Sequence, residues 1–175
     1  MKNIVYIAQS LDGYIAGKNE ELDWLDEIEN PEQNDLGWSD FMSSIDALLM
    51  GKNTFKKITS FGVWPYEKPV FVLSNSLKTI ATGFEDKVEL IKGDLKAILE
   101  RVHKKGYKNL YIDGGKLIQS FLKEDMIDEM VITTIPTLLG GGISLFGDLE
   151  KPIRFKVKSS ELLLNQMVKT HYILK

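Results

Sequence analysis

The segment from residue 110 to residue 119 constrains the fold more than any other part of the chain. An apolar run at residues 110–112 leads into Asp113 and the pair Gly114-Gly115, after which apolar residues recur at helical spacing. This order is typical of a buried parallel strand that turns directly into a helix. Glycines at such a junction allow close approach of the backbone, and a helix N-terminus offers free N–H groups to an anion. The segment therefore predicts either a phosphate-binding turn or a tightly packed strand–helix junction.

Strands and helices alternate through the first two thirds of the chain. The predicted strands are residues 3–9, 46–50, 69–73, 88–91 and 109–113. The predicted helical segments are residues 40–45, 54–59, 94–105 and 116–122. Asp94 is a plausible N-cap of the third helix, and Gly106 follows its end. Alternation of this kind predicts an α/β fold with parallel strands and helices on both faces of the sheet.

The last third of the chain is rich in strands and poor in helices. Residues 129–135, 153–161 and 168–174 predict three strands, which would add an antiparallel part to the mostly parallel sheet. The acidic stretch of residues 20–37 is the longest irregular region and a candidate active-site loop. Because no linker or repeat interrupts the pattern, residues 1–175 are expected to form a single domain.

Composition excludes several classes of function. A net charge of −3 and a pI near 5.5 argue against nucleic-acid binding. The chain has no cysteine, and its only histidines are His103 and His171. It therefore offers few of the residues needed for thiol chemistry, a metal site or a Ser-His-Asp triad. No apolar run approaches the roughly 20 residues of a membrane-spanning helix. The expected compartment is the cytoplasm, with no membrane partner.

Three turns that follow predicted strands carry groups suited to phosphate. These turns are Gly51–Thr54, with a cation, an amide and a hydroxyl, Ser74–Ser76, with two hydroxyls, and the pair Gly114-Gly115. Each turn alone could be structural, for example a helix start capped by Asn53 or Thr54. Three such turns at strand ends fit an extended dinucleotide better than chance packing, because open α/β sheets bind ligands at the carboxyl ends of their strands.

Five segments, taken in order, resemble a known family across essentially the whole chain. They are SLDGYIA at 10–16, DALLMGKNTF at 46–55, VLSN at 72–75, YIDGG at 111–115 and PTLLGGG at 136–142. Together they resemble the dihydrofolate reductase superfamily, in particular the C-terminal reductase domain of the bacterial bifunctional riboflavin-biosynthesis deaminase/reductase. The resemblance implies a three-layer fold around a mixed sheet of about eight strands, NADPH as hydride donor, a small pteridine- or pyrimidine-like substrate, and a homodimer.

The resemblance also assigns cofactor-binding residues by position. They are Ala8 and Ile15 beside the nicotinamide, Gly51, Lys52, Asn53 and Thr54 at the pyrophosphate and 2′-phosphate region, Ser74 and Asn75 by the adenosine 2′-phosphate, and Gly114, Gly115, Lys116 and Leu117 in a second phosphate-binding turn. Lys52 stands where the family often has arginine, so it would pair with phosphate as a point charge and not as a bidentate fork.

Three aspartates are candidates for the substrate side. Asp35 is the candidate for the acidic residue that assists protonation in dihydrofolate reductases, although the surrounding pattern of that family is missing. Asp113 replaces a glutamate that faces the substrate ribose in the riboflavin branch, which implies a substrate contact with a shorter reach. Asp12 is either a substrate contact or a turn-forming residue.

Hydride transfer fits a chain without metal ligands or nucleophiles, since it requires mainly placement of the reacting atoms and exclusion of water. The leading hypothesis is therefore an NADPH-dependent reductase. The alternatives are a stand-alone dihydrofolate-reductase-like enzyme of unknown substrate and a nucleotide-binding module without turnover.

Overall fold

The structure is a computed structural model that describes residues 1–175. Ten strands are present: β1 Lys2–Ser10, β2 Tyr14–Ala16, β3 Ala47–Gly51, β4 Val70–Leu73, β5 Val88–Ile91, β6 Asn109–Asp113, β7 Glu129–Ile135, β8 Ile143–Ser144, β9 Phe155–Leu163 and β10 Met167–Leu174. The four α-helices are α1 Trp38–Ser44, α2 Lys52–Ser60, α3 Leu95–Lys104 and α4 Gly115–Lys123. The region of residues 20–37 contains only a short 3-10 helix, Asp23–Leu25.

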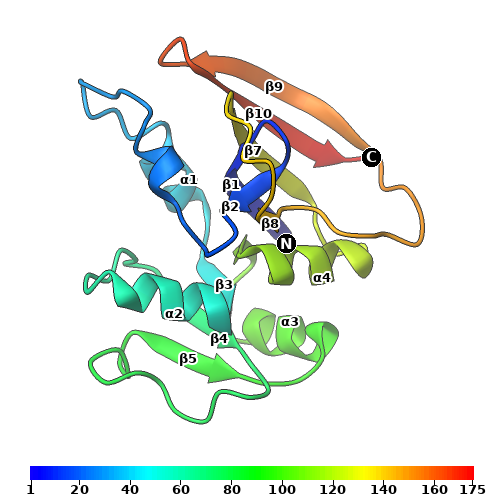
Figure 1. Cartoon of the computed structure of the whole chain (residues 1–175). Helices are drawn as coiled ribbons and strands as arrows, with labels where there is room; N and C mark the ends of the chain where they lie inside the picture. The colour runs from blue at the N-terminus through cyan, green and yellow to red at the C-terminus, as the bar shows by residue number, and fades with distance from the viewer.

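Eight strands form one central sheet in the order β5-β4-β3-β6-β1-β7-β10-β9 (Figure 1). The pairings from β5 through to β7 are parallel, while β10 is antiparallel to both β7 and β9. The mixed sheet with an antiparallel C-terminal part is therefore confirmed. The predicted strand at 153–161 lies two residues further along, because β9 pairs with β10 through a tight turn at Leu164–Gln166.

Helices cover both faces of the sheet, as the alternating pattern predicts. On one face, α3 and α4 pack against apolar side chains such as Val5, Leu49 and Ile112. On the other face, α1 and α2 pack against Leu48 and Met50, among others. Asp94 caps α3 by accepting the N–H of Ala97 at 2.9 Å, as expected from its position. The three-layer arrangement leaves the carboxyl ends of the parallel strands at one common edge.

A buried carboxylate joins the first strand to the antiparallel part of the sheet. Glu129 on β7 is 5% exposed, forms an ion pair with Lys2 on β1, and is hydrogen-bonded at 2.6 Å to Nε2 of His171 on β10. Burial on its own would raise the pKa of Glu129, but the hydrogen bonds from Lys2 and His171 outweigh it and hold the pKa below its usual value. Because the pKa is lowered on folding, this carboxylate stabilises the fold above its unfolded pKa and loses that contribution as the pH falls.

We therefore expect Glu129→Gln to lower the free energy of unfolding at neutral pH by about 2 kcal/mol, since it removes a hydrogen-bonded buried charge. Urea unfolding measured at a series of pH values checks this. The difference between the two proteins should shrink as the solution is acidified and the native carboxyl becomes protonated. A difference that stays constant down to strongly acidic pH would contradict the assignment.

No helix in the structure combines the length and the apolar character needed to span a bilayer.

Candidate functional site

A cavity of about 820 Å³ opens at the carboxyl ends of the parallel strands. The last residues of three neighbouring strands line it: Gly51 of β3, Leu73 of β4 and Asp113 of β6. The first residues of α2 and α4 line it as well. This is the edge at which open α/β sheets bind their ligands.

Most of the residues predicted from the sequence line this one cavity. The residues that do so are Ile15, Gly51, Lys52, Asn53, Thr54, Ser74, Asp113, Gly114, Gly115, Lys116 and Leu117. They come from distant parts of the chain, and the parallel strands bring them to one edge. Four predicted residues are not among the lining residues, namely Ala8, Asp12, Asp35 and Asn75.

Two helices begin at the cavity without a side-chain cap. The N-cap residues are Gly51 for α2 and Gly114 for α4, and neither helix start is capped by a side-chain hydrogen bond. Neither Asn53 nor Thr54 therefore caps the start of α2, which was the structural alternative for this turn. Uncapped N–H groups and the positive end of each helix dipole favour an anion at both places.

The glycine pair brings three predicted segments together. Gly114 has φ +96°, and a Cβ there would lie 2.0 Å from Oγ1 of Thr54. A Cβ on Gly115 would lie 2.8 Å from Cδ1 of Ile15. The glycines are thus required by close packing against neighbouring parts of the cavity wall. The tightly packed strand–helix junction is therefore confirmed, and the packed residues Ile15 and Thr54 also line the cavity.

Ammonium groups and hydroxyls surround the helix starts. The lysines that line the cavity are Lys18, Lys52, Lys57 and Lys116. Lys52 donates from Nζ to Oγ of Ser76 at 2.9 Å. Ser74 Oγ accepts the N–H groups of Ser76 and Leu77, which fixes the turn after β4. The cavity end near β4 therefore joins a cation to two hydroxyls, a set suited to a phosphate group.

Asp113 is the one carboxyl group of a sheet strand that lines the cavity. It is partly buried, and burial raises its pKa from 3.8 to about 6, although the neighbouring hydroxyls of Tyr111 and Tyr66 and the N–H of Gly114 act to lower it. Tyr66 donates its hydroxyl proton to Oδ2 of Asp113 at 3.3 Å. A carboxyl with this pKa can hold or release a proton near neutral pH.

The carboxylate of Asp12 joins two loops through hydrogen bonds. It accepts the hydroxyl proton of Ser10 at 2.6 Å and the N–H groups of Leu139 and Gly140 at 3.1 and 2.8 Å. The hydrogen bond from Ser10 is the main reason that its pKa lies below the usual value. The carboxylate of Asp12 therefore links the turn after β1 to residues 139 and 140, and Asp12 does not line the cavity.

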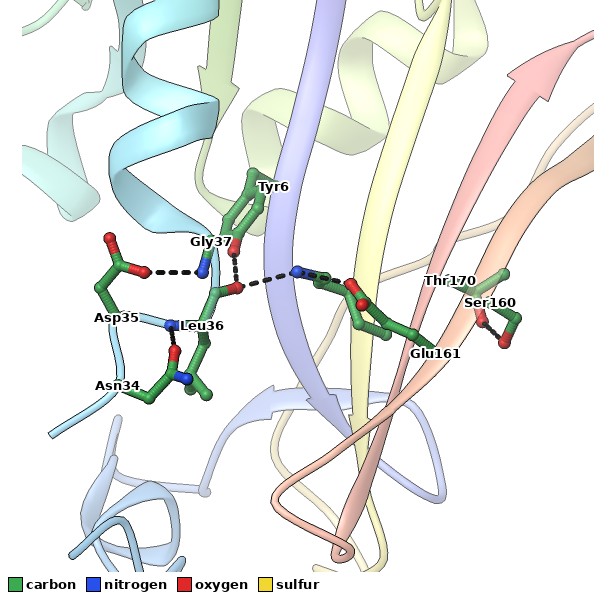
Figure 2. A network of polar contacts seen from close by, with 9 residues as sticks. Tyr6, Asn34, Asp35, Leu36, Gly37, Ser160, Glu161 and Thr170 are labelled. Carbon is green, nitrogen blue, oxygen red and sulfur yellow. Dashed lines mark hydrogen bonds and ion pairs between the residues drawn. The ribbon is translucent and has the colours of Figure 1, made fainter. Parts of the chain in front are cut away.

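Asp35 orders the start of α1. Its carboxylate accepts the N–H group of Gly37 at 2.9 Å (Figure 2). It also accepts the N–H group of Ser39 at 3.0 Å. Hydrogen bonding to Ser39 is the largest cause of a lowered pKa, so this exposed carboxylate is ionised near neutral pH. Leu36, next to it, has φ +58°, and its carbonyl accepts the hydroxyl of Tyr6 and the ammonium of Lys169.

Ala8 and Asn75 lie outside the cavity wall for different reasons. Side chains alternate along β1, so Ile7 lines the cavity while Ala8 packs on the opposite face near Trp24 and Ile135. Asn75 is exposed at the tip of the turn after β4.

Several lining residues were not among the site residues predicted from the sequence. They are Ile7, Ala16, Lys18, Glu20, Leu22, Lys57, Ile58, Phe61, Tyr66, Leu73, Ser120 and Ile143. Glu20 and Leu22 belong to the irregular region already considered a candidate active-site loop. Lys57 belongs to a basic pair on α2, and its Nζ donates to the carbonyl of Glu20 at 2.9 Å. Nothing in the local sequence marks Tyr66, which reaches Asp113 across 47 positions.

A second hollow of about 610 Å³ lies at the amino ends of β4 and β5. Two of its charged residues, Lys105 and Glu89, form an ion pair of 2.5 Å. Neither of the two helix starts of the first cavity lines this hollow, and Asp113 does not line it either.

Solved structures define the class of the fold. Dihydrofolate reductase from Enterococcus faecalis, solved with NADP(H), matches with a TM-score of 0.68 and 18% identity, covering 99% of this chain and 96% of that one. A deaminase/5-amino-6-(5-phosphoribosylamino)uracil reductase from Thermotoga maritima matches with a TM-score of 0.78 and 16% identity, covering 99% of this chain and 56% of that one. The chain thus has the dihydrofolate-reductase-like α/β fold, with its cavity at the carboxyl edge of the sheet.

Within that class, the chain belongs to the RibD C-terminal domain family, which it matches over residues 2–169. A crystal structure from Shewanella sp. PV-4, of a protein whose name provisionally assigns it to riboflavin biosynthesis, is 53% identical. The two chains superpose with a TM-score of 0.98 and coverage of 100% of this chain and 99% of the other. The sequence-based assignment to the riboflavin-reductase branch is confirmed, and the family supports an oxidoreductase.

Proposed function

We propose that this protein is an NADPH-dependent reductase that transfers a hydride to a small pteridine- or pyrimidine-like substrate. The observation that carries the proposal is one continuous cavity lined by two uncapped helix starts, four lysines and a carboxyl group with a raised pKa. The first two features suit the phosphates of a dinucleotide. The third suits proton delivery to a reduced heterocycle.

The cofactor end of the site would be built from the turns after β3, β4 and β6. Gly51–Thr54 and Gly114–Leu117 would hold the pyrophosphate at the two helix starts, because free N–H groups converge there. Lys52 and Ser74 would face the 2′-phosphate of the adenosine, a proposal supported by the hydrogen bond from Lys52 to Ser76. The cofactor, when bound, supplies the hydride.

Asp113 would act at the substrate end. Reduction of a C=N bond adds a hydride to carbon and a proton to nitrogen. In its neutral form Asp113 would hold that proton and release it to the substrate nitrogen, then recover a proton from solvent. Because the acid must be protonated, turnover should decline as the pH rises above about 6, the pKa to which burial raises this carboxyl.

Apolar side chains would hold the substrate ring. Ile7, Leu22 and Ile58 line the cavity together with Phe61, which is 60% exposed at its rim. A flat heterocycle covered by these side chains would exclude water from the reacting atoms. The cytoplasm, expected from the composition, and a homodimer, implied by the family resemblance, are part of the same proposal. Light scattering after size-exclusion chromatography tests the dimer.

The primary test is a titration of the protein with NADPH, followed through tryptophan fluorescence and energy transfer to the nicotinamide. A saturable change is expected, and its absence at millimolar cofactor would overturn the proposal. NADPH consumption with a panel of pteridines and aminopyrimidines then measures turnover. Saturable binding without consumption of any panel member would favour a nucleotide-binding module over a reductase.

Lys52→Glu should weaken NADPH at least tenfold more than NADH, because the new carboxylate repels the additional phosphate. Fluorescence titrations with both nucleotides measure the ratio. Lys56→Glu is the matched control, since Lys56 is an exposed residue of the same helix outside the cavity and changes the net charge equally. Equal losses for NADPH and NADH in the Lys52 variant would show that Lys52 does not contact the 2′-phosphate.

A further inference from the structure

Tyr66 lies in the irregular segment between α2 and β4, yet its side chain reaches the end of β6. Its hydroxyl donates to Oδ2 of Asp113 at 3.3 Å, and the residue lines the same cavity. The ring is held by Trp64, whose ring centroid lies 5.5 Å away in an edge-to-face contact, and Trp64 packs in turn on Phe55. The hydroxyl is therefore presented to the carboxyl group by a packed aromatic cluster and not by a mobile chain.

Two tyrosine hydroxyls face Asp113, and they are not equivalent. Tyr111 stands two residues before Asp113 on β6, so both side chains point to the same face of the sheet. The proton of the Tyr111 hydroxyl is already bound to the carbonyl of Tyr6 at 3.0 Å. Tyr66 has no such competing acceptor, and its proton goes to Asp113. The hydrogen bond from Tyr66 is thus the one that depends on the charge of the carboxyl group.

Other charged groups near the carboxyl come from several elements. The residues that line the cavity with it are Lys18, Glu20, Lys52, Lys57 and Lys116. Tyr6 lies behind Tyr111. Burial and the neighbouring carboxylate raise the pKa of Tyr66 far above its ordinary value, so its hydroxyl keeps its proton throughout the working range of pH. Tyr66 is accordingly a permanent donor beside a carboxyl group that changes its charge.

We propose that Tyr66 is a positioning residue that fixes one carboxyl oxygen of Asp113 and tunes when the other oxygen carries a proton. This inference rests on the proposed function, in which Asp113 is the proton donor. A donor that binds the carboxylate more strongly than the neutral carboxyl makes the acid stronger. Without Tyr66, Asp113 should therefore stay protonated to higher pH and should also lose its fixed orientation.

The first experiment uses the ligand-free protein and needs neither cofactor nor substrate. Protein labelled with ¹³C in the aspartate carboxyl carbons is titrated by NMR, and Asp113 is assigned with the Asp113→Asn variant. Tyr66→Phe is expected to move the Asp113 titration upward by about one pH unit, since a hydrogen bond to a charged group contributes that much. Tyr111→Phe should move it less, and Tyr107→Phe, a tyrosine packed on Phe71 elsewhere, should leave it unchanged.

An unchanged Asp113 titration in Tyr66→Phe, or a larger movement in Tyr111→Phe, would overturn the inference. If Tyr66→Phe does not fold, 3-fluorotyrosine at position 66 replaces it, because the ring is kept and the hydroxyl becomes a stronger donor. The titration should then move in the opposite direction, to lower pH. No movement with this residue would equally overturn the inference.

The second experiment measures kcat against pH for the native protein and Tyr66→Phe. The alkaline decline of the variant should lie about one pH unit higher, in step with its NMR titration, while its maximum falls because the acid is less well oriented. A lowered maximum with an unmoved decline would show that Tyr66 is only a packing residue. A protein with no NADPH oxidation at all would overturn the proposed function, while the NMR result would still decide the role of Tyr66.

Discussion

Replacing Asp113 with asparagine is expected to reduce NADPH-dependent turnover by about 10²- to 10⁴-fold, the usual contribution of a general acid. The affinity for NADPH should change little, because in the proposed function Asp113 acts on the substrate while the helix starts at Gly51 and Gly114 hold the cofactor. Steady-state kinetics and a fluorescence titration on the same preparation measure the two quantities. Asp113→Glu is the matched control, since it keeps a carboxyl group and should retain part of the activity.

The same substitution has a second consequence, for stability. The pKa of Asp113 is raised on folding, so its ionised form is disfavoured in the native state. Its contribution to stability is therefore greatest at acidic pH and is lost as the pH rises through about 6. Asn carries no charge, so Asp113→Asn should gain stability relative to the native protein as the pH is raised toward neutrality. A variant that is inactive and also increasingly less stable toward neutral pH would show that Asp113 supports the fold and not proton transfer.

Gly114→Ala is expected to lower the free energy of unfolding by about 3 kcal/mol, from a positive φ that alanine rarely adopts and from collision with Thr54. NADPH binding should weaken at least tenfold as well, because Thr54 and the start of α4 both line the cavity. Urea unfolding and fluorescence titration measure the two effects.

The control for this prediction is Gly51→Ala at the start of α2. Gly51 has an extended backbone with φ −79°, and an added Cβ would meet nothing within 4 Å. Gly51→Ala should therefore fold normally. The double variant Gly114→Ala/Thr54→Ala should regain part of the lost stability, because the colliding hydroxyl is gone while the backbone strain remains. If the double variant regains no stability, the whole loss in the free energy of unfolding comes from backbone strain at residue 114.

Local patterns predict most of this fold because the sheet is largely parallel. Central strands such as β3 and β6 are continuous apolar runs, and helices such as α3 carry an apolar stripe with a cap, so each element has its own signal. The boundary of β9 was less predictable. Its side chains are nearly all exposed, and its register is fixed by the turn to β10 and not by burial.

The candidate site was predictable where its residues follow strands directly. The turns after β3, β4 and β6 must share one edge of a parallel sheet, so their positions follow from topology alone. Polar residues within irregular segments have no such constraint. Asp12 and Asp35 were candidates for the substrate side, but each carboxylate accepts a backbone N–H group, from Gly140 and Gly37 respectively. The opposite holds for Tyr66. Nothing in the sequence marks it as a site residue, and its hydrogen-bond partner Asp113 is identified only in the folded structure.

The carbonyl of Leu36 accepts hydrogen bonds from two side chains of the sheet, Tyr6 (Figure 2) and Lys169. The carbonyl of Glu20 accepts a hydrogen bond from Lys57 of α2. Between these points, the carbonyl of Glu29 accepts a hydrogen bond from Gln166. Every one of these attachments uses the backbone of the irregular region, which any amino acid supplies. Trp24, by contrast, anchors the region through its buried side chain. Mutations at Glu20 and Leu22, the two residues of this region that line the cavity, can therefore alter its rim without removing either kind of attachment. For an engineer, these two positions are the place to search for new substrate preferences, with the proposed phosphate-binding turns left untouched.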